Sequence, residues 1–323
     1  MSQTAHSPRN KGRTIAAVIA VVAVILLVVL FNQIVGGKFL SLQNFNNILT
    51  ASVVPALVGW GLIFLFNSGI TDLSAGAVII ICSTVTGILG NSLGYVPMII
   101  GGILTGVVCV LLNMFIFQVS RIPSWIAGLG MTMLYEAVMA WYAQMRVAQG
   151  LKVVTLESHV RALGKAPWIY VTALVCFAIV YIVFNNTSIG LNTRAVGSNS
   201  EVARMLGIDA KKALLKGALM SGFFFGAAGV VKESYSGLVI AATGLSSIST
   251  IFQPLAAVLL AQALSKYINM CVAVPISAII IALVFNVLTL LGVPSGTFQE
   301  FLLGVVVVVF GILAQRGIKG VVK

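Results

Sequence analysis

The sequence predicts an all-α, polytopic membrane protein built as one helical bundle of about ten transmembrane helices. Hydrophobic residues make up 59% of the 323 residues and charged residues only 8%, whereas a soluble domain carries about 25% charged residues. The apolar residues fall into runs close to the roughly 20 residues that a helix needs to cross a bilayer. Because so little polar sequence separates these runs, we treat residues 1–323 as a single transmembrane domain.

Ten runs qualify as spans when they are taken in chain order. They are Thr14–Val35, Ile48–Phe66, Leu73–Gly90, Val96–Ser120, Trp125–Gln144, Pro167–Phe184, Ala213–Val231, Ile248–Ser265, Met270–Leu291 and Phe298–Ala314. The first run is long enough to span, and no small-residue cleavage site of a signal peptide clearly follows it. The G-x-x-x-G pairs Gly102–Gly106 and Gly222–Gly226 favour close helix packing within the bundle.

The distribution of basic residues predicts the orientation of these spans. An even number of spans places both termini on one side, and cytoplasmic termini put thirteen Lys and Arg residues in inner segments against six in outer ones. Four of the six lie in the outer loop 145–166, which is the exception to the rule. We therefore expect a multi-pass protein of the cytoplasmic (inner) membrane, with a cytoplasmic tail at 1–13 and the main cytoplasmic loop at 185–212.

The net charge of +12 does not predict a nucleic-acid partner. The basic residues gather at the ends of apolar runs, which is typical of topology signals beside membrane lipid rather than of a phosphate-binding face.

One polar stretch, Asn185–Lys216, interrupts the apolar sequence. Its part from Asn199 to Gly207 carries alanine and leucine at helical spacing behind Glu201 and Arg204. This pattern predicts a short amphipathic helix that lies along the membrane surface and is offered to a soluble partner.

The segment Phe66–Ala77 places Asn67 and Asp72 between two apolar runs. Asp72 can cap the helix that we expect to begin at Leu73, since its carboxylate would accept backbone N–H bonds at the positive end of the helix dipole. The alternative is a contact with a transported solute, and the two are compatible if the interrupted helix lines a cavity.

Glu136 lies near the middle of the fifth run, where a carboxylate costs about 2.5–3.5 kcal/mol on insertion scales. It could accept a hydrogen bond in a solute pathway, couple transport to protons, or pair near the outer interface with a loop base such as Arg146. Asn113 and Asn286 are more often interhelical hydrogen bonds than ligand contacts, and Trp60 lies deeper than an interfacial tryptophan. The candidate pathway residues are therefore Trp60, Asn67, Asp72, Asn113, Glu136 and Asn286.

Several chemistries are not supported by the sequence. There is no phosphate-binding G-x-x-x-x-G-K-[ST] loop, His6 and His159 both lie in loops, and the four cysteines lie in apolar runs without metal or redox spacing. We expect no catalytic residue, no metal and no cofactor in this chain. ATP, if it drives the protein, must be hydrolysed by another subunit.

Three segments resemble the permeases of ABC importers, in particular the ribose-type (monosaccharide) branch related to branched-chain amino-acid permeases. Ser68–Gly76 looks like that family's SGIDLSVGS, with one extra residue at Thr71, and Arg121–Ala127 resembles R-[VI]-P-x-[FI]-[IV]-A. Thr193–Val231 is similar to RAxGxNxxAARxxGI followed by GxxAGxAGxx, and it is the most specific of the three.

The resemblance implies that Asn199–Gly207 is a coupling helix that docks in a groove of a cytoplasmic ABC ATPase. On this interpretation Ala203, Met205, Leu206 and Gly207 pack against the ATPase, while Glu201 and Arg204 fix the orientation. It also implies an extracytoplasmic substrate-binding protein, a second permease copy or paralogue, and alternating access to a small polar solute, first of all a monosaccharide.

The loop after the eighth span departs from the family pattern. The glycine-rich GGTSLxGGxG is replaced by Ala261–Asn269, which leaves open a nucleoside or a modified sugar as the solute. An ion-coupled carrier that uses Glu136 or Asp72, with no ATPase, is the rival hypothesis from another class, and a scaffolding subunit without solute flux is a further one.

Overall fold

A computed structural model describes residues 29–150, 155–293 and 296–315, and in this part of the chain all the regular elements are helices, with one isolated β-bridge between Thr155 and Leu238. The long helices are α2 (Leu42–Phe66), α3 (Ala75–Leu93), α4 (Tyr95–Ser120), α5 (Ser124–Ala148), α6 (Trp168–Asn186), α9 (Ala210–Ser236), α10 (Ser249–Leu264), α11 (Met270–Leu290) and α12 (Thr297–Gln315). The short helices are α7 (Ser188–Ser198), α8 (Ser200–Met205) and the 3₁₀ turns η1 (Ser158–Val160), η2 (Ala162–Gly164) and η3 (Ser246–Ile248).

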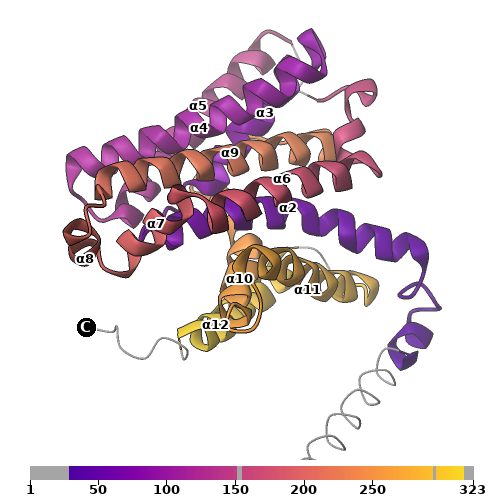
Figure 1. The fold of residues 1–323 in the computed structure, drawn as a ribbon. Helices are drawn as coiled ribbons and strands as arrows, with labels where there is room; N and C mark the ends of the chain where they lie inside the picture. The colour runs from indigo at the N-terminus through magenta and orange to yellow at the C-terminus, as the bar shows by residue number, and fades with distance from the viewer. Residues whose placement is uncertain (1–28, 151–154, 294–295, 316–323) are drawn as a thin grey trace, which may run out of the picture.

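Helices α2 to α6 and α9 form one group, with α7 and α8 at one of its ends (Figure 1). Helix α9 lies at the centre of this group and packs against α2, α3 and α4. Its core includes Phe224 and Phe225, which are fully buried, and Trp60 of α2.

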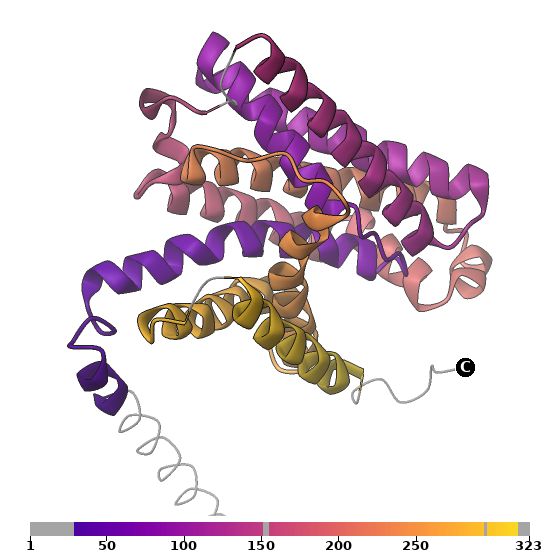
Figure 2. The same ribbon diagram turned by 180° about the vertical axis from the view of Figure 1, so that it is seen from behind.

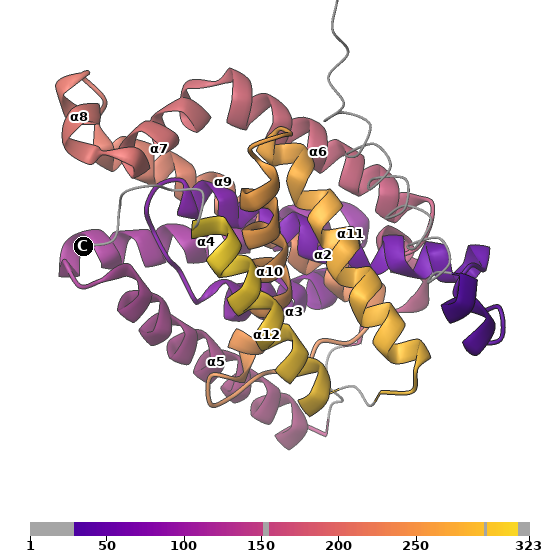
Figure 3. The same cartoon turned by 90° about the horizontal axis from the view of Figure 1, so that it is seen from below.

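Helices α10, α11 and α12 form a second group beside α2, as Figures 1 and 3 show. Helix α11 packs along α2, and α10 packs against α2, α11 and α12. Here small residues bring the helices close, since a Cβ added to Gly59 of α2 would lie 2.7 Å from Val274 of α11. Such contacts are the usual basis of helix association in lipid.

The glycine pairs expected to pack helices do so between α4 and α9. A Cβ added to Gly106 would lie 2.4 Å from the carbonyl oxygen of Gly222 and 2.6 Å from the backbone nitrogen of Gly226. The backbones of these two helices therefore touch, and no side chain fits between them.

Seven helices of the described part are long and apolar enough to cross a membrane: α2, α3, α4, α6, α9, η3 with α10, and α11. Helix α12 contributes a shorter apolar stretch, Phe298–Ile312. The predicted fifth span is the 25-residue helix α5, which is less apolar than the seven. Residues 14–28 of the first predicted span, Thr14–Val35, lie outside the described residues, and residues 29–34 of it are helical. The all-α bundle is confirmed, and the count of about ten is approximate.

Candidate functional site: a surface helix and buried polar anchors

Helix α8 stands at the end of the bundle and has well-defined ends (Figure 1). The side-chain oxygen of Asn199 accepts from the backbone N–H of Glu201 (3.0 Å) and Val202 (3.1 Å), which makes Asn199 its N-cap. At the other end Gly207 has φ +80°, a left-handed conformation that favours glycine, and the N–H of the next residue, Ile208, donates to the carbonyl oxygen of Ala203. The sequence Asn199–Gly207 thus encodes a complete, capped helix of less than two turns.

Two large apolar side chains of this segment face away from the protein. Met205 is 85% and Leu206 is 73% exposed. Glu201 and Arg204 are also exposed. Ala203 differs from expectation, because it is buried against Val196 of α7 and Ala213 of α9 rather than available to a partner.

The end of α7 lies directly on the turn that follows α2. A Cβ added to Gly197 would lie 2.0 Å from the carbonyl oxygen of Asn67, so only glycine allows this approach. Gly69 in the same turn has φ +77°, and a Cβ added to it would lie 3.8 Å from the Cα of Gly197. Movement of α7 and α8 would therefore press on the Asn67–Gly69 turn.

The Asp72 carboxylate lies buried just beyond that turn. Oδ1 accepts from the N–H of Ser74 at 2.8 Å. Helix α3 begins at Ala75 with Ser74 as its cap residue. The prediction that Asp72 caps a helix starting at Leu73 was therefore wrong, since the helix begins two residues later. Asp72 instead closes the turn before the helix, which a short side-chain carboxylate does well.

Asn113 of α4 joins this carboxylate to α5. Its amide nitrogen donates to Oδ2 of Asp72 at 3.0 Å and to the Ser74 hydroxyl, and its carbonyl oxygen accepts from the Tyr135 hydroxyl at 2.7 Å. The Tyr135 hydroxyl also lies 2.9 Å from the Cys109 carbonyl oxygen. Asp72, Ser74, Asn113 and Tyr135, which we call the buried polar network, thus tie α3, α4 and α5 together.

Glu136 also has a well-defined role in the structure. It is 4% exposed, and its two carboxylate oxygens accept from the N–H of Leu245 (2.8 Å) and of Ser247 (2.9 Å). These donors stand at the start of η3, where the helix dipole favours a negative charge. The carboxylate thus holds the entry to α10 onto α5, a role that the sequence did not indicate.

Trp60 and Asn286 have structural partners as well. The indole N–H of Trp60 donates to the carbonyl oxygen of Cys271 at 3.0 Å, and its ring packs beside Phe177 and Phe224. Asn286 and Asn44 exchange two hydrogen bonds of 2.7 and 2.9 Å between α11 and α2. Neither residue reaches the buried polar network.

Asn67 lines a cavity of about 620 Å³ between the two helix groups. Its walls are the ends of α2, α6, α7 and α10 and the start of α11, with the amides of Asn185, Gln262 and Asn269 among the lining groups. The charged lining residues, Arg194 and Lys266, are both basic. No local sequence pattern indicates this cavity, because its lining residues come from five separate segments.

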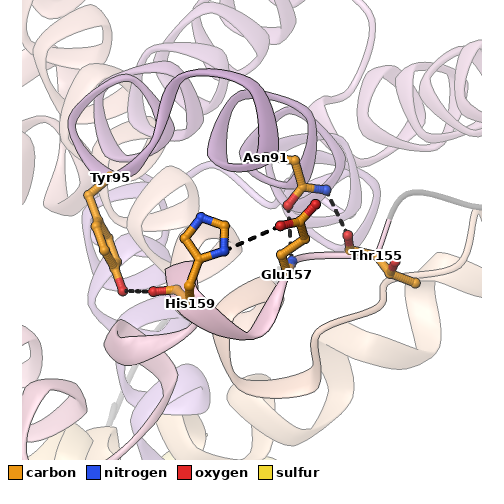
Figure 4. Close-up of polar contacts among 5 residues, drawn as sticks. All are labelled: Asn91, Tyr95, Thr155, Glu157 and His159. Carbon is orange, nitrogen blue, oxygen red and sulfur yellow. Dashed lines mark hydrogen bonds and ion pairs between the residues drawn. The ribbon is translucent and has the colours of Figure 1, made fainter.

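The loop between α5 and α6 is held on the end of α3 and the start of α4, as Figure 4 shows. Asn91 donates to the Thr155 carbonyl oxygen (2.7 Å) and accepts from the Glu157 N–H (3.0 Å), while the Tyr95 hydroxyl donates to the His159 carbonyl oxygen (2.7 Å). The exposed side chains of His159 and Glu157 lie 3.3 Å apart.

Comparison with known proteins identifies the family. Residues 44–311 match the model of the permease component of branched-chain amino acid transport systems, and the chain belongs to that family of membrane permeases. The match begins within α2 and ends within α12, so it contains both helix groups and α8.

Its relatives include a fructose import permease of Rhizobium meliloti, 25% identical over 66% of this chain and 62% of the relative. A galactose/methyl galactoside import permease of Escherichia coli is 27% identical over 67% of this chain and 70% of the relative. A D-allose permease of Escherichia coli is 24% identical over 66% of each chain. The chain thus spans less than two thirds of the length of the fructose relative. No solved structure matches it.

Proposed function

We propose that this chain is the membrane-spanning permease subunit of an ATP-driven, binding-protein-dependent ABC importer that carries a monosaccharide across the inner membrane. The observation that carries the proposal is the family match over residues 44–311, which includes the exposed helix α8. Both termini and α8 would then be cytoplasmic, as the distribution of basic residues predicts.

Helix α8 is suited to an ATPase groove. Exposed Met205 and Leu206 present apolar surface in water at the end of the protein, and a short amphipathic helix in a groove binds through a few such anchors. Glu201 and Arg204 lie beside them and would fix the orientation. Ala203 faces the permease and would hold α8 on its own scaffold.

The route from α8 into the membrane is short. Through the contact of Gly197 with Asn67, ATPase-driven movement of α7 and α8 would reach the Asn67–Gly69 turn. The next residues of that turn lead to Asp72, which is bonded to Asn113 and so to α4. Movement of α7 and α8 would therefore shift the start of α3. Alternating access between two packed states requires a mechanical connection of this kind.

The relatives and the cavity support a sugar as the solute. The names of the fructose, galactose and allose relatives are those of hexose carriers, and the cavity beside Asn67 is lined by amides that can donate and accept hydrogen bonds. A relative from Yersinia pseudotuberculosis is an autoinducer 2 import permease, so the family also carries other small polar solutes. The altered stretch Ala261–Asn269, which forms the last turn of α10 and the connection to α11, keeps a nucleoside or a modified sugar as the second candidate.

The outer face would receive the substrate-binding protein. The loop of residues 155–165 is held by Asn91 and Tyr95, so it presents a fixed surface with Glu157 and His159 exposed. A second permease copy or a paralogue would complete the membrane part.

The first experiment is to purify the permease with its co-purifying ATPase, reconstitute the complex and add binding protein with a panel of monosaccharides and nucleosides. Stimulation of ATP hydrolysis by monosaccharides supports the full proposal. Stimulation by nucleosides alone would assign a nucleoside as the solute in place of a monosaccharide. Uptake that survives ATP depletion and collapses with the proton gradient would favour an ion-coupled carrier. The absence of any co-purifying ATPase, together with no uptake of the panel, would refute the importer assignment.

A second experiment tests the docking surface. Met205→Asp with Leu206→Asp should leave insertion and thermal stability unchanged, because both side chains are exposed, and should abolish ATPase co-purification. Leu93→Asp is the matched control, since Leu93 is 65% exposed at the opposite end of the bundle. Normal co-purification with the double variant would place the ATPase contact elsewhere.

A further inference from the structure

Between α9 and α10 the chain is not helical. It leaves α9 at Gly237, whose carbonyl oxygen accepts from the N–H of Leu156 in the outer loop, and the next helical residue is Ser246. Figure 2 shows this connection running along the bundle to the start of α10. We call residues 239–245 the extended segment.

The inner end of the extended segment lies well within the bundle. The carbonyl oxygen of Ser247 packs on the first turn of α3, where a Cβ added to Gly76 would lie 2.1 Å from it. Glu136, which binds the N–H groups of Leu245 and Ser247, is the middle residue of α5, the thirteenth of 25. The segment therefore descends from the outer loop to about half the depth of α5.

One flank of the extended segment has no cover. Val239 and Ala241 line a small cavity against α3 and α5, but Ile240 is 68% exposed and Thr243 and Gly244 are exposed as well. Within the described residues, no hydrogen bond reaches the backbone N–H groups of residues 240–242.

Lipid cannot be the neighbour of this flank. An unpaired backbone group in hydrocarbon costs several kcal/mol, and irregular backbone at membrane depth persists only where protein buries it or where it lines a water-filled cavity. No described residue of this chain buries the flank. Beside the described residues, a water-filled cavity is the environment that this rule leaves for it.

We propose that the exposed flank of the extended segment lines the aqueous solute path, and that Glu136 is the positioning residue that holds it there. The proposal rests on the proposed importer function. The path offers free backbone N–H and C=O groups and the Thr243 hydroxyl, which suit a neutral solute rich in hydroxyl groups.

The need for an anchor is visible in the backbone. Gly244 and Leu245 both have φ +67°, and a residue with a side chain such as leucine rarely adopts this left-handed conformation. The two hydrogen bonds to the Glu136 carboxylate hold that geometry and fix where the segment turns into η3.

Cysteine labelling tests the placement. The four native cysteines are buried, so single variants Ile240→Cys and Thr243→Cys can be probed in the full complex in proteoliposomes with a membrane-impermeant methanethiosulfonate. Leu174→Cys is the control, because Leu174 of α6 is 66% exposed on the outer surface of the bundle. We expect labelling of both segment variants at least tenfold faster than of the control. Rates equal to the control would overturn the proposal.

Solute protection separates a path from mere water access. Saturating solute with binding protein should slow the labelling of Thr243→Cys several-fold and leave Leu174→Cys unchanged. Fast labelling that neither solute nor ATP alters would overturn the path while leaving the importer assignment intact. If the complex instead lacks ATPase activity altogether, the importer assignment fails. The water access of the extended segment is still measured in that case, because the labelling rates do not depend on ATP hydrolysis.

Two further variants test Glu136. Glu136→Leu removes both acceptors, whereas Glu136→Gln keeps one carbonyl oxygen and the side-chain shape. We expect Glu136→Leu to abolish the solute protection of Thr243→Cys, and Glu136→Gln to retain part of it. Full protection in both variants would refute the positioning role. If Glu136→Leu does not insert into the membrane, Glu136→Gln is the deciding variant. An unchanged labelling pattern and unchanged uptake in Glu136→Gln would then refute the positioning role.

Discussion

Replacement of Asn113 by leucine should destabilise the protein through the buried polar network. The Asn113 amide makes three hydrogen bonds, to Asp72, Ser74 and Tyr135. One of them goes to a carboxylate, and such bonds contribute about 1.5–3 kcal/mol, against about 1 kcal/mol for a neutral pair. Because leucine also leaves the buried carboxylate without this partner, we expect a loss of about 2–4 kcal/mol.

The assay is thermal unfolding of the purified protein in detergent. With about 2–4 °C per kcal/mol for domains of 150–250 residues, the apparent Tm should fall by about 4–16 °C. Asn47→Leu is the matched control, because Asn47 is exposed and its side chain makes no hydrogen bond within the described residues. Its Tm should change by less than about 2 °C.

A double-mutant cycle between Asp72→Asn and Asn113→Leu isolates the bond between the two side chains. Residues in one hydrogen-bond network show coupling of about 0.5–3 kcal/mol, and we expect the upper half of that range for a buried carboxylate. Tyr135→Phe should cost less, about 1 kcal/mol, because only a neutral hydroxyl is lost. Additive single effects, or an Asn113→Leu variant as stable as the Asn47→Leu control, would refute the network as an anchor.

Three other outcomes follow from the same contacts. Gly207→Val should weaken ATPase co-purification, because β-branched residues are strained at φ +80°, whereas Gly207→Asn should retain most of it; equal effects would exclude backbone strain as the cause. Gly106→Leu should prevent folding or lower the Tm by more than 10 °C, since no space exists against α9, while Gly130→Leu, which has nothing within 4 Å, should be tolerated, as measured by size-exclusion chromatography and Tm. Asn286→Leu should destabilise the protein, because the buried Asn44 Oδ1 loses its donor while the Asn44 amide nitrogen keeps only its bond to the Phe39 carbonyl oxygen. Adding Asn44→Leu should recover part of the loss, and a double variant no better than the single one would contradict this.

The sequence predicted the fold well where lipid dictates the pattern. Apolar runs near 20 residues become helices because the bilayer leaves few alternatives for the backbone, so the helix α4 ends at Ser120 as predicted. The short helix after Asn199 was predicted from alanine and leucine at helical spacing, which is a local signal. The structure adds that Asn199 and Gly207 cap its two ends.

The sequence could not reveal what joins distant segments. The contact of Asn113 with Asp72 spans 41 positions and that of Glu136 with Ser247 spans 111, and no local pattern marks such pairs. Hydropathy left residues 232–247 as a connection between the seventh and eighth spans, but it did not indicate that residues 239–245 descend to half the depth of α5. The burial of Ala203 depends likewise on how α7 and α9 pack around it.

The start of α3 is where the two proposals meet. Asp72 lies just before this helix, where a movement of α7 would arrive through the Asn67–Gly69 turn. Gly76 lies in the first turn of the helix and contacts the Ser247 carbonyl oxygen at the inner end of the extended segment. A shift of α3 relative to α5 would therefore either break the hydrogen bonds between the extended segment and Glu136 or move Glu136 together with the segment. Because packed contacts of this kind exchange between discrete arrangements rather than deform continuously, we expect ATP binding to change the labelling of Thr243→Cys in one step. A permease that docks its ATPase normally yet shows no such change would separate the surface helix from the path.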